Sequence, residues 1–199
     1  FHRDGNAFEG MKLGVGFLSR HQSEDGNINL LTTNFNSPPD TVFEIHNIGT
    51  GARLAQINDD KEVLSVFEPF LRRAGDGLAK GGVHTPNHRW VVCAALAQIN
   101  EVFPDEKYVH RIDQWLAEGV DIDEYGQFTE RSTAVYNSVC VNSLVTMAHK
   151  LQRPELLDPV RKNLDAMTYL LHPRGEVVTE VSRRQDLNSR DTMRRYWFA

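Results

Sequence analysis

The stretch GGVHTPNHRWVVCAALAQIN, residues 81–100, decides the fold. Its first half is polar and aromatic, whereas its second half is almost wholly apolar, which is typical of a helix buried on most sides. A helix start needs one capping residue, yet residues 87–90 are Asn, His, Arg and Trp in succession. The stretch therefore predicts a buried helix over 87–102, and it raises the question whether the start of that helix also forms a site.

Composition is typical of a soluble globular protein, with 199 residues of which 40% are hydrophobic and 25% charged. The formal net charge of −5 argues against general binding to nucleic acid or to an anionic membrane. No apolar run approaches the roughly 20 residues of a membrane span, and no signal peptide is visible, which leaves a bacterial cytoplasm and a periplasm both open. Cys93 and Cys140 lie in apolar helical stretches without metal-ligand spacing, so we expect buried thiols, no metal and no cofactor.

Apolar residues recur at helical spacing along most of the chain. Helices that start near residues 40, 87 and 132 are 47 and 45 residues apart, and each is followed by a second amphipathic helix. Such a period indicates stacked antiparallel αα-hairpins, either in an α/α toroid that is incomplete here or in an open solenoid. Pro69 should kink or split its helix. The predicted helices cover residues 8–20, 40–57, 61–79, 87–102, 105–118, 132–151 and 154–171.

The end of the chain changes character. Residues 175–186, GEVVTEVSRRQD, alternate apolar and polar side chains and predict a β-strand, and RRYWFA at 194–199 predicts a second one. We therefore expect an α/α-toroid domain over 1–173 and the truncated start of a β-sandwich over 174–199.

Three polar clusters precede predicted inner helices, at residues 34–44, 83–90 and 127–137. If the hairpins stack in register, the three helix starts share one rim, where free N–H groups and the helix dipoles favour an anion such as a carboxylate. Asn87 and Tyr136 lie one repeat plus one helical turn apart, so we expect them on neighbouring helices at this rim.

An amide, an imidazole and a phenol around an anion suit removal of a proton alpha to a carboxylate. Asn87 would neutralise the carboxylate by donating from its amide. His88 and Tyr136 would serve as base and acid, since either group can work in both directions. On a uronic-acid polysaccharide this chemistry is β-elimination, which leaves a 4,5-unsaturated sugar.

At these residues the chain resembles the heparinase II/III-like polysaccharide lyases. The residues that carry the resemblance are Asn87-His88 and the segment GQFTERSTAVY, 126–136, which ends at Tyr136. The resemblance implies an α/α toroid followed by a β-sandwich, an acidic oligo- or polysaccharide as substrate, and catalysis by Tyr136, His88 and Asn87. In such lyases a further histidine comes from the β-sandwich, beyond the equivalent of residue 199.

Seven further residues are candidates for substrate binding. We expect a locally positive cleft from the basic ones together with His88, a sugar platform from the indole, and a sugar subsite from the acidic ones. The pair Arg183-Arg184 is a further candidate to approach a polyanion. The seven residues are His84, Arg89, Trp90, Glu130, Arg131, Asp40 and Glu44.

Each candidate also has an ordinary structural interpretation. Asn87 would simply cap its helix, Glu130 would close a first-turn hydrogen bond, and Trp90 would pack in the core. Two other function classes remain open at this stage. A glycoside hydrolase would need two opposed carboxylates, for which Asp40 or Glu44 with Glu130 is the evident pair. A non-catalytic helical-repeat module that binds carbohydrate would need no such cluster.

Overall fold

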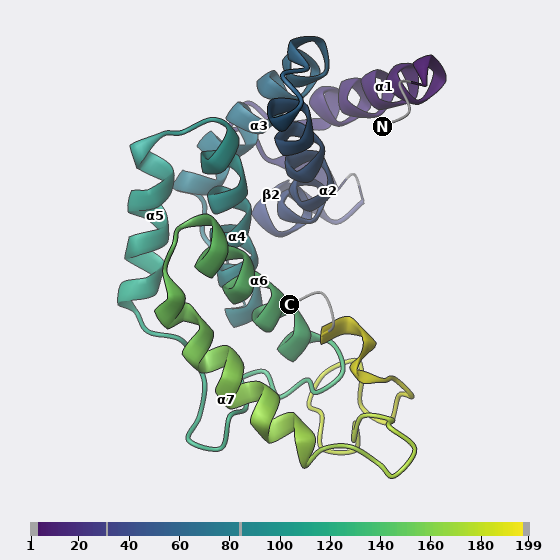
Figure 1. Ribbon diagram of the computed structural model, residues 1–199, viewed down its shortest axis with the longest axis vertical. Coiled ribbons are helices and arrows are strands. Elements are labelled where there is room, and N and C mark those ends of the chain that lie inside the picture. Colours follow the sequence, from purple (N-terminus) through teal and green to yellow (C-terminus); the bar gives the residue numbers. More distant parts are fainter. Residues whose placement is uncertain (1–3, 31, 84, 197–199) are drawn as a thin grey trace. The chain divides into compact units, whose positions relative to one another are not determined.

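The computed structural model describes residues 4–30, 32–83 and 85–196 of the chain (Figure 1). Helices make up 63% of the structure, which confirms the prediction of a mainly α protein. All seven predicted helices are found, with ends within four residues of those expected. The elements run in the order α1 (Gly5–His21), β1 (Ile28–Leu30), β2 (Asn34–Ser37), α2 (Pro38–Ile57), α3 (Lys61–Lys80), α4 (Pro86–Val102), α5 (Glu106–Ala117), α6 (Tyr136–Lys150), the 3-10 helix η1 (Pro154–Leu156), α7 (Leu157–Thr168) and the 3-10 helix η2 (Met193–Tyr196).

Local sequence explains several helix boundaries. Ser37 caps α2 by accepting the Asp40 N–H, and Pro38 follows it, where a missing N–H is tolerated. Asp60 caps α3 by accepting the Val63 N–H. Pro69 does not split this helix, because α3 runs unbroken through it, and the alternative of a kink at Pro69 stays a prediction. Buried side chains on both sides of the proline hold α3 against its neighbours and override the lost backbone hydrogen bond.

The chain divides into two compact units. The first comprises Phe1–Val83 and Ala95–Ile112, and the second comprises His84–Ala94 and Asp113–Ala199. The expected boundary between a toroid and a β-domain at residue 173 stays a prediction.

Each unit has its own apolar core. In the first unit α2 packs against α3, and in the second α6 packs against α7, where the two green helices lie side by side in Figure 1. The largest fully buried side chains are Ile45, Phe70, Leu71, Leu78, Leu96, Ile99, Tyr108 and Ile112 in the first unit and Trp90, Phe128, Leu144 and Met147 in the second.

A short glycine turn recurs after α1, α5 and α7. Each turn is closed by an isolated antiparallel bridge between residues six apart, and each encloses a glycine with a positive φ. The glycines are Gly26, Gly126 and Gly175, with φ of 98°, 84° and 82°. This conformation favours glycine because a Cβ would meet the following carbonyl oxygen. The bridges join Gln22 to Ile28, Ile122 to Phe128, and Leu171 to Val177.

In the described part of the chain, the strands predicted at its end are not formed. Residues 175–186 make single bridges instead of a ladder, and part of the second predicted strand is the 3-10 helix η2, while residues 197–199 lie outside the described residues. Val177 and Thr179 are buried, so the alternation reports local packing of a loop. The loop lacks a ladder because side chains bond its backbone, as Thr133 Oγ1 does at the Val178 carbonyl. The small sheet of β1 and β2 was not predicted.

Candidate functional site

The start of α4 is closed by a carboxylate from a distant loop. The Asn87 backbone N–H donates to Glu130 Oε2 at 3.0 Å, and the Asn87 side-chain amide donates to the same oxygen. Asn87 is 1% exposed and Glu130 is 8% exposed. A carboxylate here satisfies orphan N–H groups and complements the positive end of the helix. This arrangement is the first-turn hydrogen bond that the sequence offered as the structural alternative for Glu130.

The start of α6 is held by a second buried carboxylate, that of Asp186. Its Oδ1 accepts from Ser132 Oγ at 2.9 Å, and its Oδ2 accepts from the Ala134 N–H at 3.0 Å and from Ser182 Oγ at 2.9 Å. Ser132 Oγ in turn accepts the backbone N–H of Tyr136 at 3.0 Å. Asp186 therefore fixes the backbone before α6 without touching the Tyr136 side chain.

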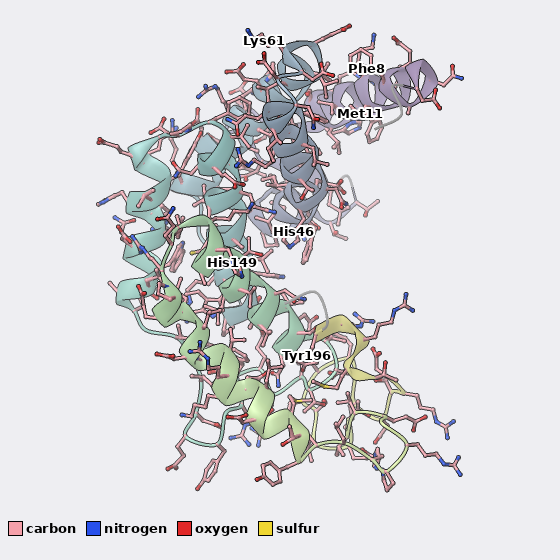
Figure 2. All side chains as sticks on the ribbon, viewed as in Figure 1. Phe8, Met11, His46, Lys61, His149 and Tyr196 are labelled. Atoms are coloured by element: carbon pink, nitrogen blue, oxygen red, sulfur yellow. The ribbon has the colours of Figure 1, made fainter. Side chains whose placement is uncertain are left out.

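The 3-10 helix η2 supports the same segment from another side. Tyr196 donates its phenol O–H to the Thr133 carbonyl oxygen, and Figure 2 shows Tyr196 beside the start of α6. Burial raises the pKa of Tyr196 well above its usual range, with the nearby Cys140, Asp186 and Asp191 acting in the same direction. The phenol therefore stays neutral and remains a donor at physiological pH.

The Tyr136 side chain lies at the surface of the segment that Asp186 and Tyr196 hold. Its phenol O–H donates to Oε1 of the exposed Gln185 at 2.9 Å, and the Arg184 guanidinium lies 5.0 Å from the centre of its ring. Arg184 Nη1 is also 3.4 Å from Glu130 Oε1. Because Glu130 bonds Asn87, these contacts connect the starts of α4 and α6 at one end of the second unit, as the sequence predicted.

Arg89 and Trp90 share one acidic partner that sequence reasoning missed, Asp121. Asp121 Oδ1 accepts from Arg89 Nη2 at 3.0 Å and from the Trp90 indole N–H at 2.8 Å. Arg89 Nη1 also contacts Glu118 at 2.9 Å, and its guanidinium lies 4.4 Å from the indole centre. Trp90 is fully buried, so its expected role as a sugar platform is corrected to core packing, and Arg89 is already neutralised by two carboxylates.

The remaining basic candidates do not produce the expected excess of positive charge. Arg131 is exposed but lies 3.2 Å from an oxygen of Asp123. His88 contacts Thr85 Oγ1 through Nδ1 at 2.7 Å, and His84 lies outside the described residues. In the described part of this cluster, the guanidinium groups of Arg89, Arg131 and Arg184 each face a carboxylate. The net charge of the cluster is therefore balanced rather than positive.

The acidic candidates of the first repeat belong to the first compact unit. Asp40 Oδ2 accepts from Ser37 Oγ at 2.5 Å at the start of α2, and Glu44 is exposed on the same helix. Their expected partner in a hydrolase, Glu130, has a side chain only 6% exposed and bonds the first turn of α4. A general acid must reach its substrate, so Glu130 in this position does not support the hydrolase alternative.

Both cysteines are buried, as expected. Desolvation raises the pKa of the Cys140 thiol well above its usual range, and the carboxylates of Asp121 and Glu130 raise it further. A neutral buried thiol is a poor nucleophile. Among the described residues no group of three or more His, Cys, Asp or Glu side chains could hold a metal ion. No helix in the described part of the chain is both long and apolar enough to cross a membrane.

At this end of the second unit, the accessible functional groups are thus the phenol of Tyr136 and the guanidinium of Arg184 next to it. No family model matches the chain, and no curated protein or solved structure matches it significantly.

The sequence placed Tyr136 near the start of a predicted helix, but it did not indicate how that helix start is held. Gln185 and Asp186 were read as part of a strand, although a strand whose buried face ends in a carboxylate is unusual. Ser182 and Asp186 are four residues apart, a spacing at which a hydroxyl and a carboxylate can close a turn. That polar spacing was the available signal against a strand.

Proposed function

We propose that this chain cleaves a uronic-acid oligo- or polysaccharide by β-elimination, with Tyr136 as the central catalytic residue, and that its hairpins belong to an α/α toroid. The observation that carries the proposal is the position of the Tyr136 phenol. It is half-buried, it is hydrogen-bonded to the exposed Gln185, and it lies beneath the cationic Arg184. A core tyrosine would instead bury its hydroxyl on a backbone partner, as Tyr196 does.

The reaction needs three tasks from the protein. A donor must stabilise the negative charge that builds on the carboxylate when the C5 proton leaves. A base must take that proton, and an acid must protonate the oxygen that departs from C4. We assign the base to His88 and the acid to Tyr136, whose phenol O–H donates to the exposed Gln185 at 2.9 Å.

The proposed reaction consumes no water. The C5–H pair becomes the C4–C5 double bond while the C4–O bond breaks, and the leaving oxygen receives the Tyr136 proton. His88 has gained a proton and Tyr136 has lost one, so exchange with solvent restores both. The products are one new reducing end and one unsaturated, ultraviolet-absorbing end.

A product analysis tests this function against its alternatives. The chain is incubated with polymers of mannuronate, galacturonate and glucuronate, and both reducing ends and ultraviolet absorbance are measured. Equal gains of reducing and unsaturated ends on one polymer support β-elimination. Reducing ends without absorbance would instead identify a hydrolase, and binding without any new ends would identify a carbohydrate-binding module. Either outcome overturns the proposal.

A further inference from the structure

The side chain expected to neutralise the substrate carboxylate is not available to a ligand. Both donors of Asn87, its backbone N–H and its amide, converge on one oxygen of Glu130, and Asn87 is 1% exposed. A ligand carboxylate would have to displace a buried carboxylate from a helix start, where the N–H groups and the helix dipole both favour it. Another hydrogen-bond donor near Tyr136 must therefore neutralise the substrate carboxylate.

We propose that Arg184 binds the uronate carboxylate, an assignment that rests on the proposed β-elimination at Tyr136. The Arg184 side chain is 33% exposed, so it can reach a ligand. Its guanidinium lies 5.0 Å from the centre of the Tyr136 ring, which places a carboxylate bound to it beside the phenol. Guanidinium groups bind carboxylates through two parallel N–H bonds, which orients the ligand as well as holding it.

The contact between Arg184 and Glu130 orients the guanidinium without using its donors. The Nη1–Oε1 distance is 3.4 Å, longer than a good N–H···O hydrogen bond. Glu130 Oε1 is accordingly a buried oxygen without a hydrogen-bond partner among the described residues. Glu130 thus serves two purposes, because one of its oxygens closes α4 and the other attracts Arg184 to the neighbourhood of Tyr136.

The other arginines of the cluster are less suited to bind the uronate carboxylate. Arg89 has a side chain 13% exposed and is bonded to both Glu118 and Asp121. Arg131 contacts Asp123 within its own loop. Arg183 is exposed and adjacent to Arg184 in the sequence, so it is a matched control for simple charge.

Binding to acids and to their methyl esters tests the assignment. Affinities are measured by calorimetry for oligogalacturonate and oligomannuronate and for their fully methyl-esterified forms, in a Tyr136→Phe background that keeps the sugar intact. Arg184→Gln should weaken binding of the acid about 10- to 100-fold, the range for a hydrogen bond to a charged group. It should leave ester binding unchanged, which also shows that the variant is folded. Arg184→Lys should fall between, because it keeps the charge and loses the two parallel bonds.

The control and the possible outcomes separate this inference from the function on which it rests. Arg183→Gln should change acid binding by less than about 3-fold, as expected for an exposed charge. If Arg183→Gln and Arg184→Gln weaken the acid equally, or if Arg184→Gln weakens acid and ester alike, the assignment is wrong. If acid binding depends on Arg184 but the wild-type chain forms no unsaturated ends, the lyase function fails and the carboxylate site stands. If the chain binds neither sugar, both proposals fall.

Discussion

The two loops at residues 121–131 and 171–186 begin with the same turn and serve different helix starts. Each turn contains a glycine at positive φ, Gly126 and Gly175, which lie 49 residues apart. The first loop carries Glu130 to the start of α4, and the second carries Asp186 to the segment before α6. In Figure 1 the second loop is the yellow chain around the lower end of α6.

The carboxylates of Glu130 and Asp186 differ in how much of the neighbouring helix start they leave accessible. Glu130 bonds the first turn of α4 directly, so Asn87 is enclosed. Asp186 acts through Ser132, so the backbone of Tyr136 is fixed while its phenol remains accessible. A polar residue at a helix start is therefore enclosed or accessible according to how its backbone N–H is satisfied, and the residue type alone does not decide this.

The largest difference in the free energy of unfolding should be that between substitutions of Gly126 and Gly175. In Gly126→Ala the new Cβ would lie 2.4 Å from the Lys162 carbonyl oxygen of α7, whereas at Gly175 nothing lies within 4 Å. We expect Gly126→Ala to lower the free energy of unfolding by about 3–4 kcal/mol, since strain at positive φ adds to a backbone clash. Gly175→Ala should lower it by about 1 kcal/mol, the strain alone. Urea unfolding measures both, and equal losses would show that the first turn does not pack on α7.

Removing the carboxylate from the closed helix start should have the next largest effect. Glu130→Ala removes the carboxylate that accepts from two buried donors of Asn87, its backbone N–H and its side-chain amide, so we expect a loss of about 2–3 kcal/mol in the free energy of unfolding. Glu130→Gln keeps one acceptor and the side-chain shape, and it should lose about half as much. The same urea titration checks this, and a loss below about 0.5 kcal/mol for Glu130→Ala would mean that water replaces the carboxylate.

A smaller effect is expected from the amide itself. Asn87→Ala keeps the backbone N–H bond to Glu130 and removes only the bonds of the side-chain amide to Glu130 and Thr85, so the free energy of unfolding should fall by about 1–2 kcal/mol. Because Asn87 is enclosed, the affinity for an acidic oligosaccharide should change less than about 3-fold in the molecules that remain folded. A large loss of affinity without a loss of stability would return the role of carboxylate donor from Arg184 to Asn87.

The helices of this protein could be predicted because their signals are local. Apolar periodicity, Ser37 and Asp60 as caps, and the prolines before α2 and α4 are all readable from neighbouring residues. The starts of α4 and α6 were also predicted to lie at one end, since the 45-residue spacing repeats a structural unit.

The carboxylates that bond these helix starts could not be predicted in the same way. Glu130 lies 43 residues from Asn87 and Asp186 lies 52 residues from Ala134, so each pairing depends on the tertiary fold. The alternation at residues 175–186 was misleading because two buried residues of a loop, Val177 and Thr179, mimic the inner face of a strand. The turn at Gly126 and Gly175 was visible in the sequence only as an isolated glycine at each position.

The proposed proton donation by Tyr136 is tested most directly by one variant. Tyr136→Phe loses one hydrogen bond to an exposed Gln185, so its free energy of unfolding should change by less than about 1 kcal/mol. Tyr125→Phe is the control, because that tyrosine is 75% exposed and lies in the loop at 121–131. The measurement is the initial rate of ultraviolet-absorbing product from the uronate polymer that the wild-type chain cleaves. We predict a fall of at least about 100-fold in Tyr136→Phe and none in Tyr125→Phe. A Tyr136→Phe rate close to that of the wild type would show that Tyr136 only packs against its neighbours and would contradict the proposed mechanism.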